Sequence, residues 1–271
     1  WTDRKTAAEL PMILRPLESR TAQALSSDFQ PAWSVVEKIQ KQQYPSCWLV
    51  TQPSHAALAG EMAARLNAPA VPKMEAELIR AIALHDAGWG MPDAQVVMRS
   101  RTGQLKNPQS FLQCSVQEFL AAWTQSIDIA QSTSPAGGYM VSRHFWRLAE
   151  HRLKSAQDQA QDRKALEGFT SRESDRQTEL ARKQKRSAAE LEQLTDVLQF
   201  CDLLSLYVCC GSNESVEFPE FCGAKVRITG NANQYRMSPN LMEPGSKFLL
   251  AALLHPARKD RSGEEIQVAF D

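Results

Sequence analysis

The segment AIALHDAGWG, residues 81–90, places an imidazole and a carboxylate side by side at the end of an apolar stretch. Apolar side chains recur with a helical period over residues 74–88, which predicts one amphipathic helix there. Gly88 can end that helix, because glycine readily adopts the left-handed conformation found at helix C-termini. His85 and Asp86 would then lie in the last turn, where the helix dipole favours a cation. The pair indicates either an ordinary polar helix end or a metal site.

The chain as a whole carries no charge bias. Its 271 residues include 31 basic and 31 acidic side chains, so the formal net charge is zero. This balance argues against bulk nucleic acid or an anionic membrane as a partner. No apolar run reaches the roughly 18 residues that a membrane-spanning helix needs. The six cysteines form no C-x-x-C pair and lie mostly among apolar residues, which favours reduced thiols in a cytoplasmic protein.

Composition divides the chain into parts of different character. Residues 1–11 are polar and precede Met12, so we expect an added leader or upstream extension that is poorly ordered. Residues 12–211 show helical periodicity and predict a helical domain. Within it, 91–110 should be irregular, and the charged residues 158–190 should form a solvated helical segment. Short, turn-punctuated segments in 212–271 predict a small β-rich appendage packed on the helical body. The expected fold class is therefore mainly α, a helical bundle with a small β-rich C-terminal appendage.

Chemically distinctive side chains recur in the other apolar segments. His55 opens one predicted helix, His144 lies within another, and Asp202 lies in the apolar stretch QFCDLLS. A lone buried histidine is most often a hydrogen-bonded core residue, but an unpaired carboxylate is costly to bury. A divalent cation would satisfy the imidazoles and the carboxylates together. The pattern therefore favours a metal site over a polar helix end.

The order of these residues resembles that of the HD superfamily of metal-dependent phosphohydrolases. The resemblance rests on His55, on the adjacent pair in LHDAGW and on Asp202 in FCDLLS. The segments CWLVTQPSHAALAGEMA, AIALHDAGW and SRHFW also resemble an uncharacterised bacterial family with an HD-like helical fold, over roughly residues 12–257. The resemblance implies an HD-like helical bundle whose metal ligands are His55, His85, Asp86 and Asp202.

The resemblance also implies a chemistry. Imidazole and carboxylate ligands suit Mn, Fe, Ni, Co or Zn better than Ca. The implied activity is hydrolysis of a small phosphorylated metabolite or nucleotide by metal-activated water. Asp86 and His144 would be the catalytic residues, with His144 acting as a further ligand, as a ligand of a second metal or as a proton donor.

Three more residues are candidates for substrate binding. Arg143 and Arg147 share a predicted helix with His144 and could hold a phosphate through forked hydrogen bonds, although surface salt bridges are the commoner role of such arginines. Trp89 stands where many HD phosphodiesterases have lysine, in motifs such as HDIGK. Its indole could stack on a base or close the core. Asp93 could be a carboxylate that supports the metal ligands from outside, but we interpret it as a loop residue.

Two other functions are compatible with these residues. An HD-like protein without hydrolytic activity would serve as a ligand-binding or interaction module, because the lysine is replaced and no glutamate stands out as a general base. A diiron oxygenase on the same helical scaffold would use His144 as an additional iron ligand.

Overall fold

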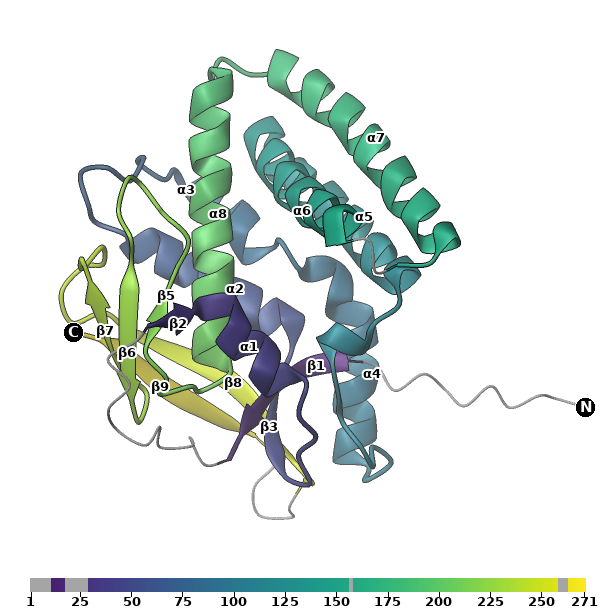
Figure 1. Ribbon diagram of the computed structural model, residues 1–271, viewed down its shortest axis with the longest axis vertical. Coiled ribbons are helices and arrows are strands. Elements are labelled where there is room, and N and C mark those ends of the chain that lie inside the picture. The colour runs from purple at the N-terminus through teal and green to yellow at the C-terminus, as the bar shows by residue number, and fades with distance from the viewer. Residues whose placement is uncertain (1–10, 18–28, 156–157, 258–262) are drawn as a thin grey trace, which may run out of the picture.

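The computed structural model describes residues 11–17, 29–155, 158–257 and 263–271 (Figure 1). The expected leader at residues 1–11 lies, apart from its last residue, outside the described residues. The helices are α1 (Ala32–Gln40), α2 (Gln52–Arg65), α3 (Ala76–Ala83), α4 (Gly90–Arg101), α5 (Val116–Thr133), α6 (Pro135–Ser155), α7 (Ala160–Arg182) and α8 (Ala188–Cys209), with short 3-10 turns η1 (Ala87–Trp89) and η2 (Phe111–Gln113). The strands are β1 (Pro11–Pro16), β2 (Gln30–Pro31), β3 (Cys47–Val50), β4 (Gln109–Ser110), β5 (Val216–Glu217), β6 (Arg227–Asn231), β7 (Gln234–Ser238), β8 (Lys247–His255) and β9 (Glu264–Phe270).

Within the described residues, the strands form one mixed nine-stranded sheet in the order β2-β5-β6-β7-β9-β8-β3-β1-β4. Strand β8 is the longest and runs antiparallel to both β9 and β3. Buried Phe248, Leu250 and Ala252 alternate along β8 with more exposed side chains, as expected of a strand that presents one face to a core. That face packs against α2 and joins the main core.

The expected fold class is wrong, because the sheet is not a C-terminal appendage. Strands β1 and β3 come from the first 50 residues and continue the sheet beyond β8, with Leu49 opposite Leu253. The two strands have 6 and 4 residues, and the β8 partner of β3 follows it some 200 positions later in the chain. The local sequence patterns of β1 and β3 therefore do not indicate the larger sheet to which these strands belong. The molecule combines this sheet with the helices in one structure.

Helix α8 connects the sheet to the distant helices. It contacts α6 on one side and α1, α2 and β1 on the other. Figure 1 shows α8 upright between the sheet and the group formed by α5, α6 and α7. Its first turn is held by a capping box, in which Ser187 and Glu190 exchange side-chain and backbone hydrogen bonds. Helix α7, in the charged segment, packs along α6 and buries Leu166, Phe169 and Leu180.

The chain around the HD pair differs from the sequence-based expectation. Helix α3 ends at Ala83, so His85 and Asp86 lie in a turn just beyond it, before η1 and α4. Residues 90–101 form α4 rather than an irregular segment, because Pro92 falls in the first turn, where its missing N–H costs nothing. Gly88 does not adopt a positive φ. It is required instead by close packing, because a Cβ there would lie 2.1 Å from the carbonyl oxygen of Ala122 in α5.

Among the described helices, none has the length and apolar composition needed to span a bilayer.

Replacing Gly88 by alanine should destabilise the fold by about 1–3 kcal/mol, because the methyl group has no room against the α5 backbone. Urea unfolding followed by circular dichroism measures this change. Gly90 is the matched control, because nothing lies within 4 Å of a Cβ at that position. Gly90→Ala should leave stability unchanged or raise it by up to about 1 kcal/mol, since Gly90 has a helical backbone. Equal stability of the two variants would contradict the packing argument.

Candidate metal centre

Five side chains from four parts of the chain meet beside α8. His55 comes from α2, His85 and Asp86 from the turn after α3, His144 from α6 and Asp202 from α8. We call them the His/Asp cluster. The three imidazoles are at most 2 % exposed, and the side chain of Asp202 is 15 % exposed. Two sets of three residues could each hold an ion: His55, His85 and Asp86, and His85, His144 and Asp202. Within each set the ligand atoms lie within 4.8 Å of one another, and the two sets share His85.

Four distances between imidazole and carboxylate atoms describe the centre of the cluster. His55 Nε2 lies 2.9 Å from Asp86 Oδ2 and 3.6 Å from Asp202 Oδ1. His85 Nε2 lies 3.6 Å from Asp86 Oδ2 and 3.3 Å from Asp202 Oδ1. Ligands held at about 2.0–2.2 Å from one ion, at tetrahedral or octahedral angles, lie about 2.8–3.6 Å from each other. Each of these four imidazole–carboxylate distances is that of two ligands on one ion, and the two aspartates belong to different candidate ligand sets that share His85.

The hydrogen bonds behind two of the imidazoles set their tautomers. Ser205 Oγ donates its single proton to the carbonyl oxygen of Asp202, so it accepts a hydrogen bond from His55 Nδ1–H at 2.8 Å. His85 Nδ1–H donates to the carbonyl oxygen of Ile82 at 2.7 Å. In the neutral form, both rings then present an unprotonated Nε2 to the carboxylates. This is the state that a metal ligand needs.

Without a cation, the two aspartates favour the protonated form of one imidazole, that of His85. Burial alone lowers the pKa of His85, but the carboxylates of Asp86 and Asp202 outweigh burial and raise that pKa to about 9. Burial raises the pKa of Asp202, whereas its hydrogen bond to His85 and the three surrounding imidazoles hold it well below the usual range. The cluster is thus a concentrated negative site, which a cation or a proton must neutralise.

His144 differs from the other two histidines. Its Nε2 lies 3.6 Å from Asp202 Oδ2, whereas His85 pairs with the other oxygen, Oδ1. Its Nδ1 is buried with no hydrogen-bond partner among the described residues. Burial lowers the pKa of His144 to about 4, so the ring is neutral near pH 7. A neutral imidazole suits a further ligand or a proton acceptor better than the proton donor considered from sequence.

The two arginines expected to bind phosphate are already paired. Arg147 forms ion pairs with Glu192 at 2.5 Å and with Asp196 at 2.7 Å. Arg143 forms an ion pair with Glu192 at 2.9 Å and lies over the ring of Trp146. The structure therefore gives both arginines the salt-bridge role that the sequence left as the alternative.

Trp89 lies beside the cluster, buried in η1 with its ring edge-on to Phe119. It also lines a cavity of about 680 Å³ that reaches His55, Asp86, His144 and Asp202.

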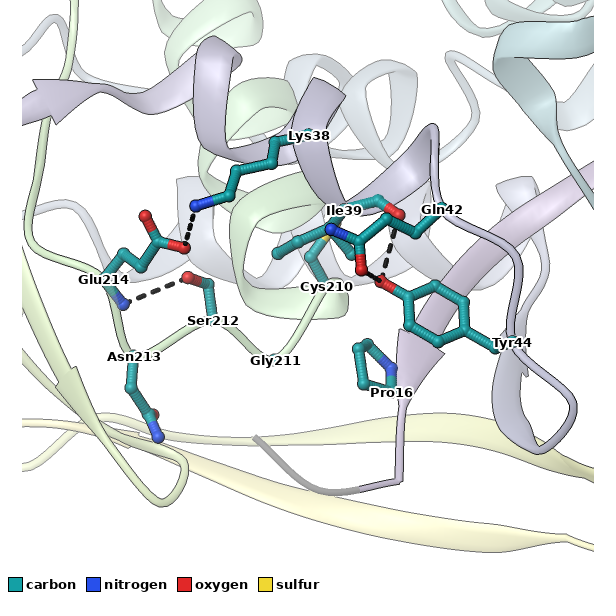
Figure 2. Close-up of a pocket in the computed structure, with 10 residues that line it drawn as sticks. All are labelled: Pro16, Lys38, Ile39, Gln42, Tyr44, Cys210, Gly211, Ser212, Asn213 and Glu214. Atoms are coloured by element: carbon teal, nitrogen blue, oxygen red, sulfur yellow. Dashed lines mark hydrogen bonds and ion pairs between the residues drawn. The ribbon is translucent and has the colours of Figure 1, made fainter. Parts of the chain in front are cut away.

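A second, much smaller cavity of about 50 Å³ lies at the C-terminal end of α8. Figure 2 shows several of its polar side chains paired with one another, such as Lys38 with Glu214. The large cavity is the candidate substrate site, because the His/Asp cluster forms part of its wall.

Sequence reasoning missed two residues that support the cluster. Ser205 lies one helical turn after Asp202, and a serine at that spacing from a predicted ligand could have been found. Asp93 is not a loop residue: it is buried in α4 and accepts a hydrogen bond from the backbone N–H of Gln52 at 2.6 Å. It thereby fixes the start of α2, the helix that carries His55. The sequence did not indicate this role for Asp93, because the neighbouring Pro92 favoured an irregular segment over a helix.

A comparison with protein-family models places residues 39–244 in a family described as a protein of unknown function, DUF3891. The chain belongs to the DUF3891 family. The matched DUF3891 region contains the whole His/Asp cluster, whereas β1 precedes it and β8 and β9 follow it. No curated protein and no solved structure gives a significant match. The family description names no activity, so the relationship to the HD superfamily stays a prediction.

Stability should depend on pH through Asp93. Burial raises the pKa of Asp93 to about 8, whereas an aspartate in the unfolded chain titrates near about 3.9. Between these values the folded state holds a proton that the unfolded state has lost, so this contribution to stability falls as the pH rises from about 4 to 8. Between pH 5 and 8.5, the free energy of unfolding of the wild type, measured with urea, should fall by on the order of a few kcal/mol relative to that of Asp93→Asn. Asp175→Asn, at an exposed position of α7, is the control and should track the wild type. A constant difference between wild type and Asp93→Asn would contradict the assignment.

Proposed function

We propose that this chain is a metal-dependent phosphohydrolase of the HD type that acts on a small phosphorylated molecule. The observation that carries the proposal is the convergence of two imidazole Nε2 atoms on two carboxylates, each imidazole–carboxylate distance being that of two ligands on one ion. The order of these residues along the chain, which resembles the HD superfamily, supports the same proposal. All six cysteines are free thiols, which supports a reducing, cytoplasmic setting.

His55, His85, Asp86 and Asp202 are the residues we assign to holding the metal, which would be Mn, Fe, Ni, Co or Zn. When bound, such an ion lowers the pKa of a water molecule and neutralises negative charge on a phosphoryl oxygen. The chain contributes the orientation of the ligands. Ser205 and the carbonyl group of Ile82 hold the two imidazole rings in the tautomer that leaves Nε2 unprotonated.

His144 is the residue we assign to handling a proton, because it lines the large cavity and lies next to Asp202 without joining the central four atoms. Trp89 closes the cavity beside Asp86 and excludes water from that wall. Neither arginine is assigned to the phosphate, since acidic partners already neutralise both.

A second candidate is a module that binds a ligand without hydrolysing it. It is favoured by Trp89, which stands where the HD phosphodiesterase motif has lysine, and by the pairing of both arginines. This alternative predicts purified protein without stoichiometric metal, and ligand binding that does not change when Asp86 is replaced.

Asp86→Ala should abolish metal binding and hydrolysis together. Elemental analysis of the purified wild type should find about one transition-metal ion per chain, and the variant should hold almost none. Its rate on phenyl phosphate should fall at least about 100-fold. Asp196→Ala is the matched control, because Asp196 is a carboxylate on the cavity wall that lies outside the cluster. It should retain the metal. Normal turnover by metal-free Asp86→Ala protein would overturn the proposed function.

A further inference from the structure

The large cavity has an unusual lining for a site that handles phosphate. Its volume of about 680 Å³ exceeds what a phosphate group requires and lies in the range of pockets that enclose whole organic ligands. Most of its lining side chains are aromatic or aliphatic. The His/Asp cluster occupies one part of the wall, so a molecule in the cavity has a polar end and an apolar body.

Two aromatic walls bound the apolar part. In the first, Trp89 lies edge-on to Phe119 with centroids 5.6 Å apart, Phe119 contacts Trp123 at 5.3 Å, and Trp123 stacks on Phe145 at 5.0 Å. These four residues come from η1, α5 and α6. Because all four line the cavity, they present a continuous aromatic surface to its contents.

The second wall belongs to α8 and the segment after β5. Phe200 and Phe221 stack with centroids 4.3 Å apart and an interplanar angle of 2°, and Phe218 packs on Phe200 at 5.6 Å. All three are at most 5 % exposed and line the cavity. Leu148 lines the cavity with 37 % of its surface exposed, which places it at the opening.

Positive charge for a polyphosphate is missing from the described lining residues. Its two arginines are Arg147, paired with Glu192 and Asp196, and Arg152, whose guanidinium donates two hydrogen bonds to Asp158 at 2.8 and 2.9 Å. Asp196 and Glu220 add carboxylates to the same lining. A nucleoside triphosphate would bring several negative charges to a wall without unpaired guanidinium groups.

We propose that the substrate is a phosphate monoester of a bulky apolar alcohol, with an aromatic ring system between the two aromatic walls and the phosphate at the His/Asp cluster. The reaction in this inference rests on the proposed function. The apolar body of the substrate is inferred from the cavity alone. Hydrolysis forms a bond from the water oxygen to phosphorus and breaks the ester P–O bond. The alcohol leaves with one proton of the water, and inorganic phosphate is the other product.

The test of substrate class compares 1-naphthyl phosphate with phenyl phosphate, using the full chain loaded with Mn²⁺. The two leaving groups have similar acidity and differ in apolar area, so a difference in kcat/KM reports the cavity. We expect 1-naphthyl phosphate to be preferred by about tenfold. ATP should neither be hydrolysed faster than phenyl phosphate nor compete at equal concentration. Preference for ATP, or equal kcat/KM for the two aryl esters, would overturn the proposal.

Leu148→Ser tests the cavity by substitution. Leu148 is partly exposed, so its replacement should preserve the fold, and thermal unfolding checks this. KM for 1-naphthyl phosphate should rise roughly fivefold, because apolar contact is lost at the opening. Leu249→Ser is the matched control, because Leu249 is 56 % exposed on β8 and does not line the cavity. It should leave KM unchanged. Equal KM values for the two variants would contradict an apolar body at this position.

A binding measurement separates this inference from the proposed function. Calorimetric titration of the metal-free chain with 1-naphthol, which has no phosphate, should show binding that Leu148→Ser weakens and Leu249→Ser does not. If this binding occurs but no ester is hydrolysed, the cavity assignment stands and the hydrolase proposal fails. If metal binds and phosphate esters are hydrolysed but 1-naphthol does not bind, the apolar substrate class is wrong and the hydrolase proposal stands.

Discussion

Asp202 holds a carboxylate within the apolar helix α8, where its side chain is only 15 % exposed. Such a charge is costly to bury unless nearby groups neutralise it. Helix α2, the turn after α3 and helix α6 each supply one imidazole against Asp202. The arrangement of these elements around α8 is therefore tied to the carboxylate at the centre of the His/Asp cluster.

The cluster could be predicted from sequence because its residues are chemically conspicuous in apolar surroundings. His55, His85 and Asp202 each interrupt a hydrophobic pattern, and the structure brings them together. The helix ends around them could not be predicted as well. The sequence predicts that Gly88 ends a helix by adopting a left-handed conformation. In the structure, glycine is required there because helix α5, more than 30 residues further along the chain, leaves no room for a side chain.

The sheet could not be predicted for a similar reason. Strand β3 has four residues, and its pairing with β8 spans some 200 positions, so neither segment alone indicates the partner. Long-range pairing depends on tertiary context that local periodicity does not contain. By contrast, β6 and β7 pair locally through the turn at Ala232 and Asn233, whose positive φ values suit a tight hairpin. The segment GNAN, residues 230–233, consists largely of the glycine and asparagine residues that are typical of such turns.

The contact between Gly88 and Ala122 has a consequence for how the site could change. Gly88 follows Asp86 by two residues, and Ala122 immediately precedes Trp123, so the close approach of Gly88 to Ala122 joins the turn that carries Asp86 to an aromatic wall of the cavity. A substitution that displaces α5 to reshape the cavity will also move the turn that carries Asp86. The shape of the cavity and the position of the Asp86 carboxylate are therefore coupled through α5, whereas a substitution at Leu148, at the opening, changes the cavity without passing through this contact.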